Sequence, residues 1–145
     1  EKVLINDWLY TGDIGEIDQD GYLKITDRKK DIIVTIGGDN VSPSKIENML
    51  CLHDEIEQAY VHGDNEKYLS CLIVTKKNIE LDNQKIKKLI DRTNNDLTIV
   101  EKIKKYQVIK EDFTIENELL TPTMKIRRHK IKIKYKNIIE KFYRN

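Results

Sequence analysis

Two short segments of the sequence combine an acid or a run of bases with a turn. Asp13 follows a Thr-Gly pair at the end of an apolar stretch, and a carboxylate in such a turn can accept two hydrogen bonds from a vicinal diol such as that of a ribose. Arg28 and Lys30 lie in the charge run at 27–31, where their cations could bind a phosphate. Taken singly, these residues are better explained by a plain turn and a solvated charge run.

Two further segments could do chemistry through an open main chain or a mobile loop. Gly37 and Gly38 would let a ligand approach the backbone closely, but no Gly-Lys-Ser/Thr follows them, so they form no phosphate loop. Lys125 lies in a loop of Pro and Thr, from which a lysine could enter a site and stabilise developing negative charge. A simple turn and one more lysine of a lysine-rich tail are the alternatives, and periodicity cannot choose between them.

The histidines and cysteines do not form a metal-binding pattern. The histidines lie far apart, and the cysteines lack the spacing of a zinc site: His53, His62, His129, Cys51 and Cys71. We therefore expect no metal site on this chain. Serine is sparse and none lies in a Gly-x-Ser-x-Gly turn, so nothing suggests a Ser-His-Asp hydrolase.

Short strands and helices must position these residues. An Asp-Gly pair between alternating segments predicts a hairpin over 14–25, and Ser42 followed by Pro43 predicts the start of a helix. Strands are expected at 3–5, 8–10, 14–17, 22–25, 32–36, 56–62, 68–75, 106–109 and 113–115, and helices from 43, around 86–97 with an extension or a third helix at 99–106, and over 126–143. Strands and helices without regular βαβ alternation predict an α+β domain.

Charge is distributed unevenly along the chain. The 26 Lys and Arg nearly balance the 25 Asp and Glu, yet residues 121–145 hold nine bases and one acid, a balance of +8, while the other 120 residues balance at −7. A basic tail on an acidic body suggests an anionic partner such as nucleic acid, anionic lipid or nucleotide phosphates. A solvated lysine-rich helix face explains the same tail about equally well.

The composition excludes several classes of protein. With 145 residues, six Gly, two Pro and two Cys, the chain is neither a collagen, a disulfide scaffold nor a low-complexity linker. Its apolar runs are far shorter than the ~20 residues that span a bilayer, and no secretory signal is visible. The unpatterned cysteines suit a reducing cytoplasm, which is the location we expect. Because residue 1 is Glu in strand-like sequence, we expect a piece of a longer protein.

Taken together, four segments in fixed order carry a family resemblance. They read WLYTGD at 8–13, GYLKITDRKKD at 21–31, GGDNVSPSKIE at 37–47 and LTPTMKI at 120–126. This order resembles the C-terminal end of the acyl-adenylate-forming, AMP-binding enzymes, which include acyl-CoA synthetases, luciferases and peptide-synthetase adenylation domains. The Thr-Pro-Thr-Met-Lys loop and the stretch at 58–69 look most like long-chain fatty-acid CoA ligases.

The resemblance implies a two-step reaction and a two-domain enzyme. A carboxylate attacks the α-phosphate of ATP in the presence of Mg²⁺, giving acyl-adenylate and pyrophosphate, and the thiol of coenzyme A then displaces AMP. Residues 1–27 would be the closing strands of a large N-terminal domain that is otherwise absent. Residues 28–145 would be the mobile C-terminal lid domain. The fold expected for the whole chain is α+β, with an N-terminal β-hairpin segment followed by a small mixed sheet of about three strands flanked by helices.

Three nucleotide and hinge roles follow from the resemblance, residue by residue. Asp13 matches the Thr-Gly-Asp acid that holds the ribose hydroxyls of ATP or AMP. Arg28 matches the arginine that contacts the nucleotide near the hinge. Lys30 falls at the hinge position itself, where the family uses Asp or Lys.

Two further segments match the parts that act in the two half-reactions. Gly37 and Gly38 match the loop that enters the site for thioester formation and lines the coenzyme A tunnel. Lys125 matches the catalytic lysine of adenylation. The common form before that lysine is Ser-Gly, whereas this sequence has Thr123 and Met124, and we expect the loss of the glycine to stiffen the loop.

Alternatives remain at this stage. The chain could belong to a peptide-synthetase or luciferase-like branch of the same family. Outside enzymes, it could be a stand-alone basic-tailed module for nucleic acid or membrane, although few aromatic residues are interleaved with the bases and we expect no nucleic acid partner. Contact of the basic C-terminal helix with the inner face of a membrane stays open. The expected partners are the large domain, fatty acid, ATP and coenzyme A.

Overall fold

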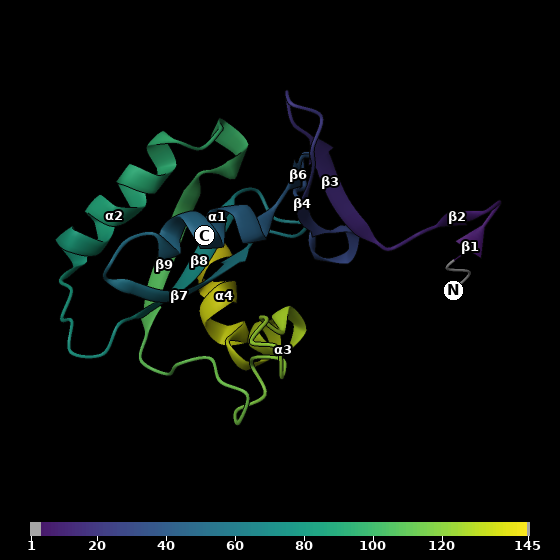
Figure 1. The fold of residues 1–145 in the computed structure, drawn as a ribbon. Helices are drawn as coiled ribbons and strands as arrows, with labels where there is room; N and C mark the ends of the chain where they lie inside the picture. The colour runs from purple at the N-terminus through teal and green to yellow at the C-terminus, as the bar shows by residue number, and fades with distance from the viewer. Residues whose placement is uncertain (1–3, 145) are drawn as a thin grey trace.

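The computed structural model describes residues 4–144. A three-stranded mixed sheet forms the centre, helices cover it on both sides, and small hairpins extend away from it toward the N-terminus (Figure 1). The predicted α+β class and the three-stranded mixed sheet are confirmed. Of the strand expected at 3–5, the first residue lies outside the described residues.

The N-terminal part consists of two hairpins in series. Each is an antiparallel pair: β1 (Leu4–Ile5) with β2 (Trp8–Leu9), and β3 (Asp13–Ile17) with β4 (Leu23–Arg28). The second is the hairpin that the Asp-Gly pair predicted. Its turn is closed by the Asp18 carboxylate, which accepts the backbone N–H groups of Asp20 and Tyr22 at 3.0 and 2.9 Å. Gly21 takes a φ of +86°, which a residue with a side chain adopts only with strain.

A short connection joins these hairpins to the first helix. Its elements are the 3₁₀ turn η1 (Lys29–Asp31), the antiparallel pair β5 (Ile33–Val34) and β6 (Asn40–Val41), and the helix α1 (Pro43–Cys51). The predicted helix start is confirmed, since the Ser42 side chain accepts the N–H of Lys45 and Pro43 occupies the first helical position.

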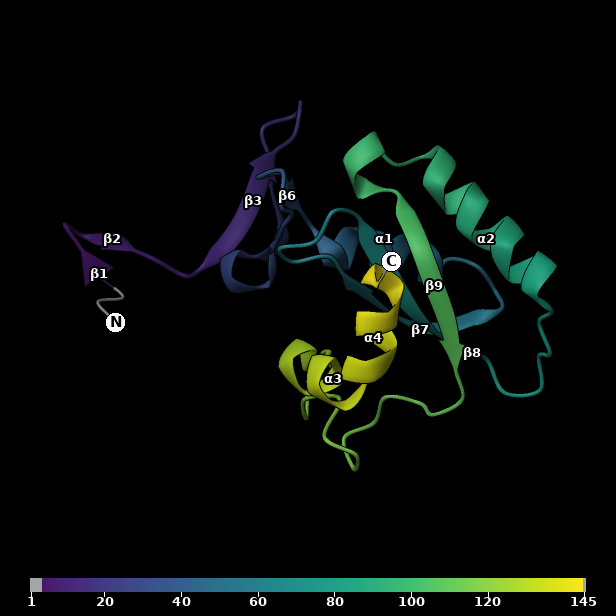
Figure 2. The ribbon, with the colours of Figure 1, turned by 180° about the vertical axis from the view of Figure 1, so that it is seen from behind.

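The central sheet is built from β7 (Ile56–His62), β8 (Leu69–Thr75) and β9 (Ile103–Ile109). The middle strand β8 pairs antiparallel with β7 and parallel with β9. A parallel pair requires a crossover, and α2 (Asn83–Asn95) supplies it between β8 and β9. Figure 2 shows β9 at the edge of the sheet beside α2.

The expected helix at 99–106 and the expected strand at 113–115 are both wrong. After α2, the chain makes one 3₁₀ turn, η2 (Ile99–Glu101), and enters β9. The Asn94 side chain binds both the N–H and the C=O of Ile103 at 2.9 Å, which ends the helix and starts the strand. Likewise, the Gln58 side chain binds both backbone groups of Phe113, so that residue needs no strand partner.

The basic C-terminal segment forms two short helices rather than the single helix expected over 126–143. They are α3 (Arg128–Lys134) and α4 (Lys136–Tyr143). Between them, Tyr135 leaves helical geometry at φ −102° and ψ 19°. Its ring lies 6.4 Å from that of Phe113, and its hydroxyl donates to Glu111 at 3.2 Å. These tertiary contacts explain the break.

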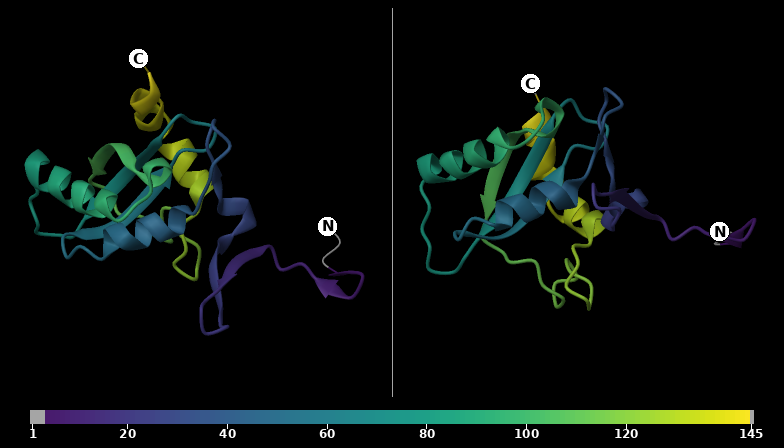
Figure 3. Two further views of the ribbon diagram at one scale, coloured as in Figure 1. Left: turned by 90° about the horizontal axis from the view of Figure 1, so that it is seen from above. Right: turned by 45° about the horizontal axis from the view of Figure 1, so that its top comes forward.

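Two hydrophobic cores lie on the two faces of the sheet. The side chains of β7 alternate between them, because successive residues of a strand point to opposite faces. Ala59 and Val61 pack with α1 and α2, whereas Tyr60 packs with α3 and α4. Figure 3 shows the C-terminal helices on the opposite side of the sheet from α1 and α2. In the part of the chain that the structure describes, no helix combines the length and apolarity needed to cross a bilayer.

Candidate functional site

Lys125 lies in a tight hairpin at residues 120–126. This hairpin directly precedes α3 and borders the hydrophobic core that contains Tyr60. Leu120 and Ile126 form a β-bridge at the base of this hairpin, and the backbone N–H of Thr121 donates to the carbonyl of Lys125 at 2.8 Å. The Thr121 hydroxyl accepts the N–H of Lys125 at 3.0 Å, which closes the loop from inside. The Lys125 side chain is exposed, and no carboxylate within residues 4–144 forms an ion pair with it.

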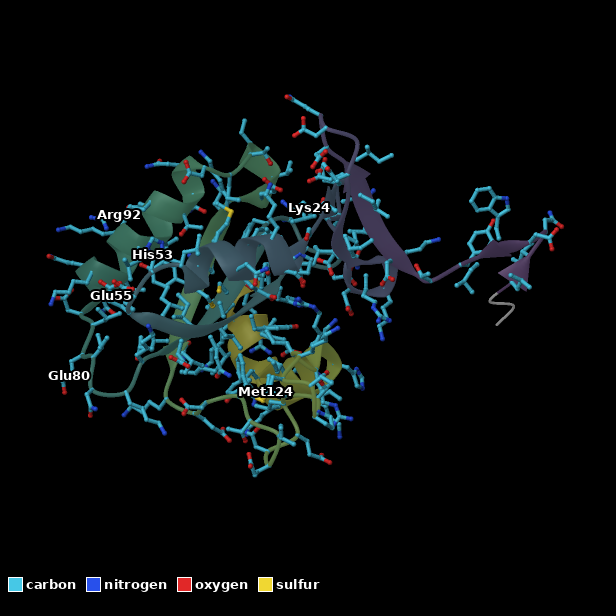
Figure 4. The ribbon with its side chains drawn as sticks, in the orientation of Figure 1. Lys24, His53, Glu55, Glu80, Arg92 and Met124 are labelled. Atoms are coloured by element: carbon cyan, nitrogen blue, oxygen red, sulfur yellow. The ribbon has the colours of Figure 1, made fainter. Side chains whose placement is uncertain are left out.

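Met124, the residue before this lysine, has left-handed backbone geometry with a φ of +63°. Such a conformation costs a residue with a side chain roughly 1–2 kcal/mol, whereas glycine adopts it freely. The position therefore favours the glycine that the resembling enzymes commonly carry there. The side chain of Met124 is 65% exposed, at the edge of the C-terminal helices (Figure 4), so it gains little from packing in return.

Asp13 and Arg28 are brought together by the register of the β3–β4 hairpin. They are cross-strand partners, and Nε of Arg28 lies 3.1 Å from Oδ1 of Asp13. Both line a cavity of about 670 Å³, which Lys125 also lines. The structure thus brings together three of the residues that the sequence singled out.

Lys30 lies in η1, directly after the hairpin, and is exposed. It lines a neighbouring hollow of about 630 Å³ together with Arg28 and Lys125. The expected hinge thus lies beside the expected nucleotide-binding residues, on the turn that connects β4 to the rest of the chain.

Gly37 and Gly38 form the turn between β5 and β6, and neither lines the cavity that holds Lys125. Gly38 has a φ of +87° and no atom within 4 Å of where a Cβ would stand, so its backbone is open. Thr35 and Asp39 hold the turn, through hydrogen bonds between their side chains and from the Asp39 N–H to the Thr35 hydroxyl, each 3.2 Å long. The glycine turn is thus a separate element from the Lys125 hairpin.

A buried ion pair connects the segment after Lys125 to α1. The Arg128 guanidinium donates to both oxygens of Glu47, each at 2.7 Å, and Glu47 also accepts the N–H of Val61 at 2.8 Å. The two side chains are 19% and 7% exposed. Burial raises the pKa of Glu47, and the guanidinium and the Val61 N–H act in the opposite direction. In this bidentate geometry, two N–H groups of the guanidinium donate in parallel to the two oxygens of one carboxylate.

Asp27 makes a second connection, from the hairpin to the start of α1. Its carboxylate is buried and accepts the Ser42 hydroxyl at 2.8 Å and the N–H groups of Arg28 and Ser44. Asp27, Glu47 and Arg128 were not recognised as structural partners from the sequence. One signal was available, because Glu47 shares the buried face of its helix with Ile46 and Leu50, and an acid there requires a partner.

The basic tail is partly neutralised in the fold. Within residues 4–144, five of its nine bases form ion pairs with acids: Arg128 with Glu47, Lys130 with Glu118, Lys134 with Glu111, and Lys136 and Arg144 with Glu140. The acids paired with Arg128, Lys130 and Lys134 lie outside the tail, so the sequence positions of these three bases give no sign of the pairing. The surface offered to an anionic partner is therefore weaker than the count of nine bases indicates.

Sequence comparison places the chain in a family. Residues 30–145 match the model of the AMP-binding enzyme C-terminal domain, and the chain belongs to this family. Among curated relatives, the long-chain-fatty-acid–CoA ligase FadD15 of Mycobacterium tuberculosis is 34% identical over 94% of this chain and 26% of its own length. Long-chain-fatty-acid–CoA ligase 6 of Rattus norvegicus is 35% identical over 94% of this chain and 23% of its own length. The chain spans about a quarter of these relatives.

Solved structures share the fold. The adenylation domain of a carboxylate reductase from Mycobacterium chelonae superposes with a TM-score of 0.86 at 25% identity, over 97% of this chain and 24% of that one. The A domain of a carboxylic acid reductase from Segniliparus rugosus, solved with AMP and a co-purified carboxylic acid, gives a TM-score of 0.85 at 24% identity, covering 98% and 24% of the two chains. The chain thus shares the fold of about a quarter of each of these adenylation domains.

Proposed function

We propose that this chain is the C-terminal quarter of an ATP-dependent long-chain fatty-acid CoA ligase. In the first step, a carboxylate oxygen attacks the α-phosphorus of ATP, and the bond to pyrophosphate breaks. In the second, the thiol of coenzyme A attacks the acyl carbon, and AMP leaves. The two fatty-acid CoA ligases at 34% and 35% identity support this substrate class.

One observation carries the role of this chain in the first step. The Lys125 hairpin brings a lysine that forms no ion pair within residues 4–144 to the cavity that Asp13 and Arg28 also line. A cation delivered beside the α-phosphate offsets the negative charge that develops in the transition state. In this proposal, Asp13 accepts hydrogen bonds from the ribose hydroxyls, and Arg28, its ion-pair partner, contacts the nucleotide.

The second step is assigned to the turn at Gly37 and Gly38. Because this turn does not line the Lys125 cavity, the same position of the domain would not serve both steps. Rotation about the hinge at Lys30 would exchange the two elements, which is gating by domain motion. The open backbone at Gly38 would admit the pantetheine arm of coenzyme A without a steric clash.

The magnesium ion of such a reaction does not fit this chain. Across residues 4–144, no group of three or more His, Cys, Asp and Glu side chains is arranged to hold a metal ion. We propose that the large domain supplies its ligands. The apolar side chains that the N-terminal hairpins expose would pack against the same large domain: Trp8, Leu9, Tyr10, Ile17, Tyr22 and Leu23.

The test is ATP–pyrophosphate exchange by the complete protein, with a long-chain acid such as palmitate. Lys125→Ala should lower the exchange by about 10²–10³-fold, or about 3–4 kcal/mol, because it removes one directed charge contact. Thioester formation from supplied acyl-adenylate should change by no more than about threefold. Lys87→Ala, which removes an exposed lysine on α2, is the matched control and should leave both steps unchanged.

Other outcomes separate the alternatives. Equal loss of both half-reactions in Lys125→Ala would refute the role of the lysine. Exchange without acyl-CoA formation would indicate a different acceptor, as in other branches of the family. If no fatty acid supported exchange, the proposed substrate class would be wrong.

A further inference from the structure

The Lys125 hairpin is fixed to the body of the domain by the ion pair between Arg128 and Glu47. Arg128 follows Lys125 by three residues, directly where the hairpin ends and α3 begins. Its guanidinium is held at 2.7 Å by each oxygen of Glu47, and Glu47 is itself held by the N–H of Val61 in the central sheet. This chain of contacts runs from the reactive lysine to the rigid sheet in three short steps.

The other contacts of Arg128 fix its orientation. The guanidinium lies 6.0 Å from the ring centroid of Tyr60, and it reaches the Ser44 hydroxyl at 3.4 Å. A planar guanidinium that makes two parallel hydrogen bonds resists rotation, which a single ammonium contact would allow. The two hydrogen bonds to Glu47 therefore fix the direction in which the backbone passes from the Lys125 hairpin into α3.

The glycine turn is held independently of this pair. The N–H of Ile36 donates to the carbonyl of Glu66 at 3.0 Å, and the N–H of Asn65 donates to that of Val34 at 2.8 Å. These bonds, together with the link between Thr35 and Asp39 already described, do not involve Glu47 or Arg128. Loss of the ion pair should loosen the lysine hairpin and leave the glycine turn in place.

We propose that Arg128 is a positioning residue for adenylation, which acts by holding the Lys125 hairpin through Glu47. The inference rests on the proposed function, because it assigns Arg128 to the half-reaction in which Lys125 takes part. Arg128 lines the same cavity as Lys125, but its guanidinium is bound to Glu47 and Ser44, and in this proposal it contacts no substrate. A displacement of a catalytic group by about 1 Å can cost on the order of 10²-fold in rate, so a loosened hairpin has a measurable effect.

The variants must separate positioning from folding. Arg128→Met leaves the Glu47 carboxylate buried without a partner and is expected to be unstable. The double variant Glu47→Gln with Arg128→Met avoids this, because glutamine is neutral and retains an acceptor for the Val61 N–H. Arg128→Lys keeps the charge without the fork. Arg92→Met, an exposed arginine on α2 well away from Met124 in Figure 4, is the matched control.

The experiment measures both half-reactions of the complete protein at a temperature where each variant is folded. The double variant should lower ATP–pyrophosphate exchange with palmitate by about 10–100-fold and thioester formation from supplied acyl-adenylate by less than about threefold. Arg128→Lys should fall between it and wild type. In a Lys125→Ala background, the same double change should add less than about threefold, because a residue that acts through Lys125 has nothing left to position.

Two results would overturn the proposal. A purely structural role would lower both half-reactions together and would add its full effect to that of Lys125→Ala. A separate measurement, which does not depend on activity, is hydrogen exchange at the backbone amides of Lys125 and Arg127. These amides donate to the Thr121 hydroxyl and to the Leu119 carbonyl. Unchanged protection of these amides in the double variant refutes the positioning role by itself. If the wild-type protein catalyses no ATP–pyrophosphate exchange, the proposed function is refuted instead.

Discussion

Acidification should destabilise this domain through His62, whose ring is buried at the end of β7. The residue is 6% exposed. Its ring stacks on that of Tyr60 at 6.4 Å and meets the edge of Tyr143 at 6.1 Å. Burial, and secondarily the nearby Lys132, lower the pKa of His62 to about 4, while Asp64 acts in the opposite direction. The folded state therefore keeps this imidazole neutral well below the ordinary pKa of a histidine.

The sign and size of the effect follow from proton linkage. With a folded pKa of about 4 and an ordinary value of 6.5, the unfolded chain binds more protons than the folded chain between these limits. The stability contributed by His62 is complete above about pH 6.5 and is lost as the pH falls toward 4. From about pH 7.5 to about pH 5, the calculated loss from this residue alone is about 2 kcal/mol.

The assay is urea unfolding of the 145-residue chain at a series of pH values, compared with the same series for His62→Gln. The wild-type free energy of unfolding should fall by about 2 kcal/mol more than that of the variant over this interval. His129→Gln is the matched control, because it removes an imidazole that is exposed to solvent in the folded chain. Parallel pH curves for wild type and His62→Gln would refute the reasoning, and so would a curve with the opposite slope.

Two further predictions concern backbone geometry and packing. Met124→Gly should raise the free energy of unfolding by about 0.5–1 kcal/mol, because relief of the left-handed strain exceeds the added entropy of the unfolded chain; a thermal melt that shows destabilisation would contradict this. Gly63→Ala should cost about 1–3 kcal/mol in urea unfolding, since its Cβ would lie 2.3 Å from Cδ2 of the fully buried Leu69. An unchanged midpoint for Gly63→Ala would show that Leu69 can move aside.

The local sequence determined most of the secondary structure. The Asp-Gly turn, the Ser-Pro helix start and the strands at 56–62 and about 69–75 rest on interactions between near neighbours, and all of them occur as expected. The failures share one cause. Asn94, Gln58 and Tyr135 redirect the chain through side-chain contacts with partners that lie 9 to 55 residues away.

The sequence also determined the family. Four motifs in fixed order predicted the AMP-binding C-terminal domain, and the family model that matches residues 30–145 confirms it. The sequence predicted a role for Lys125 in adenylation, but by sequence position Arg128 was one base among the nine of the tail.

Only the tertiary structure decided how the candidate site is held together. Hairpin register pairs Asp13 with Arg28 across two strands, and folding brings Arg128 to Glu47 over 81 residues of chain. Burial then turns a solvated charge into a directed contact, because a cation and a carboxylate that have lost their water must satisfy each other. No spacing rule contains that information, since it depends on which surfaces the sheet and helices bury against one another.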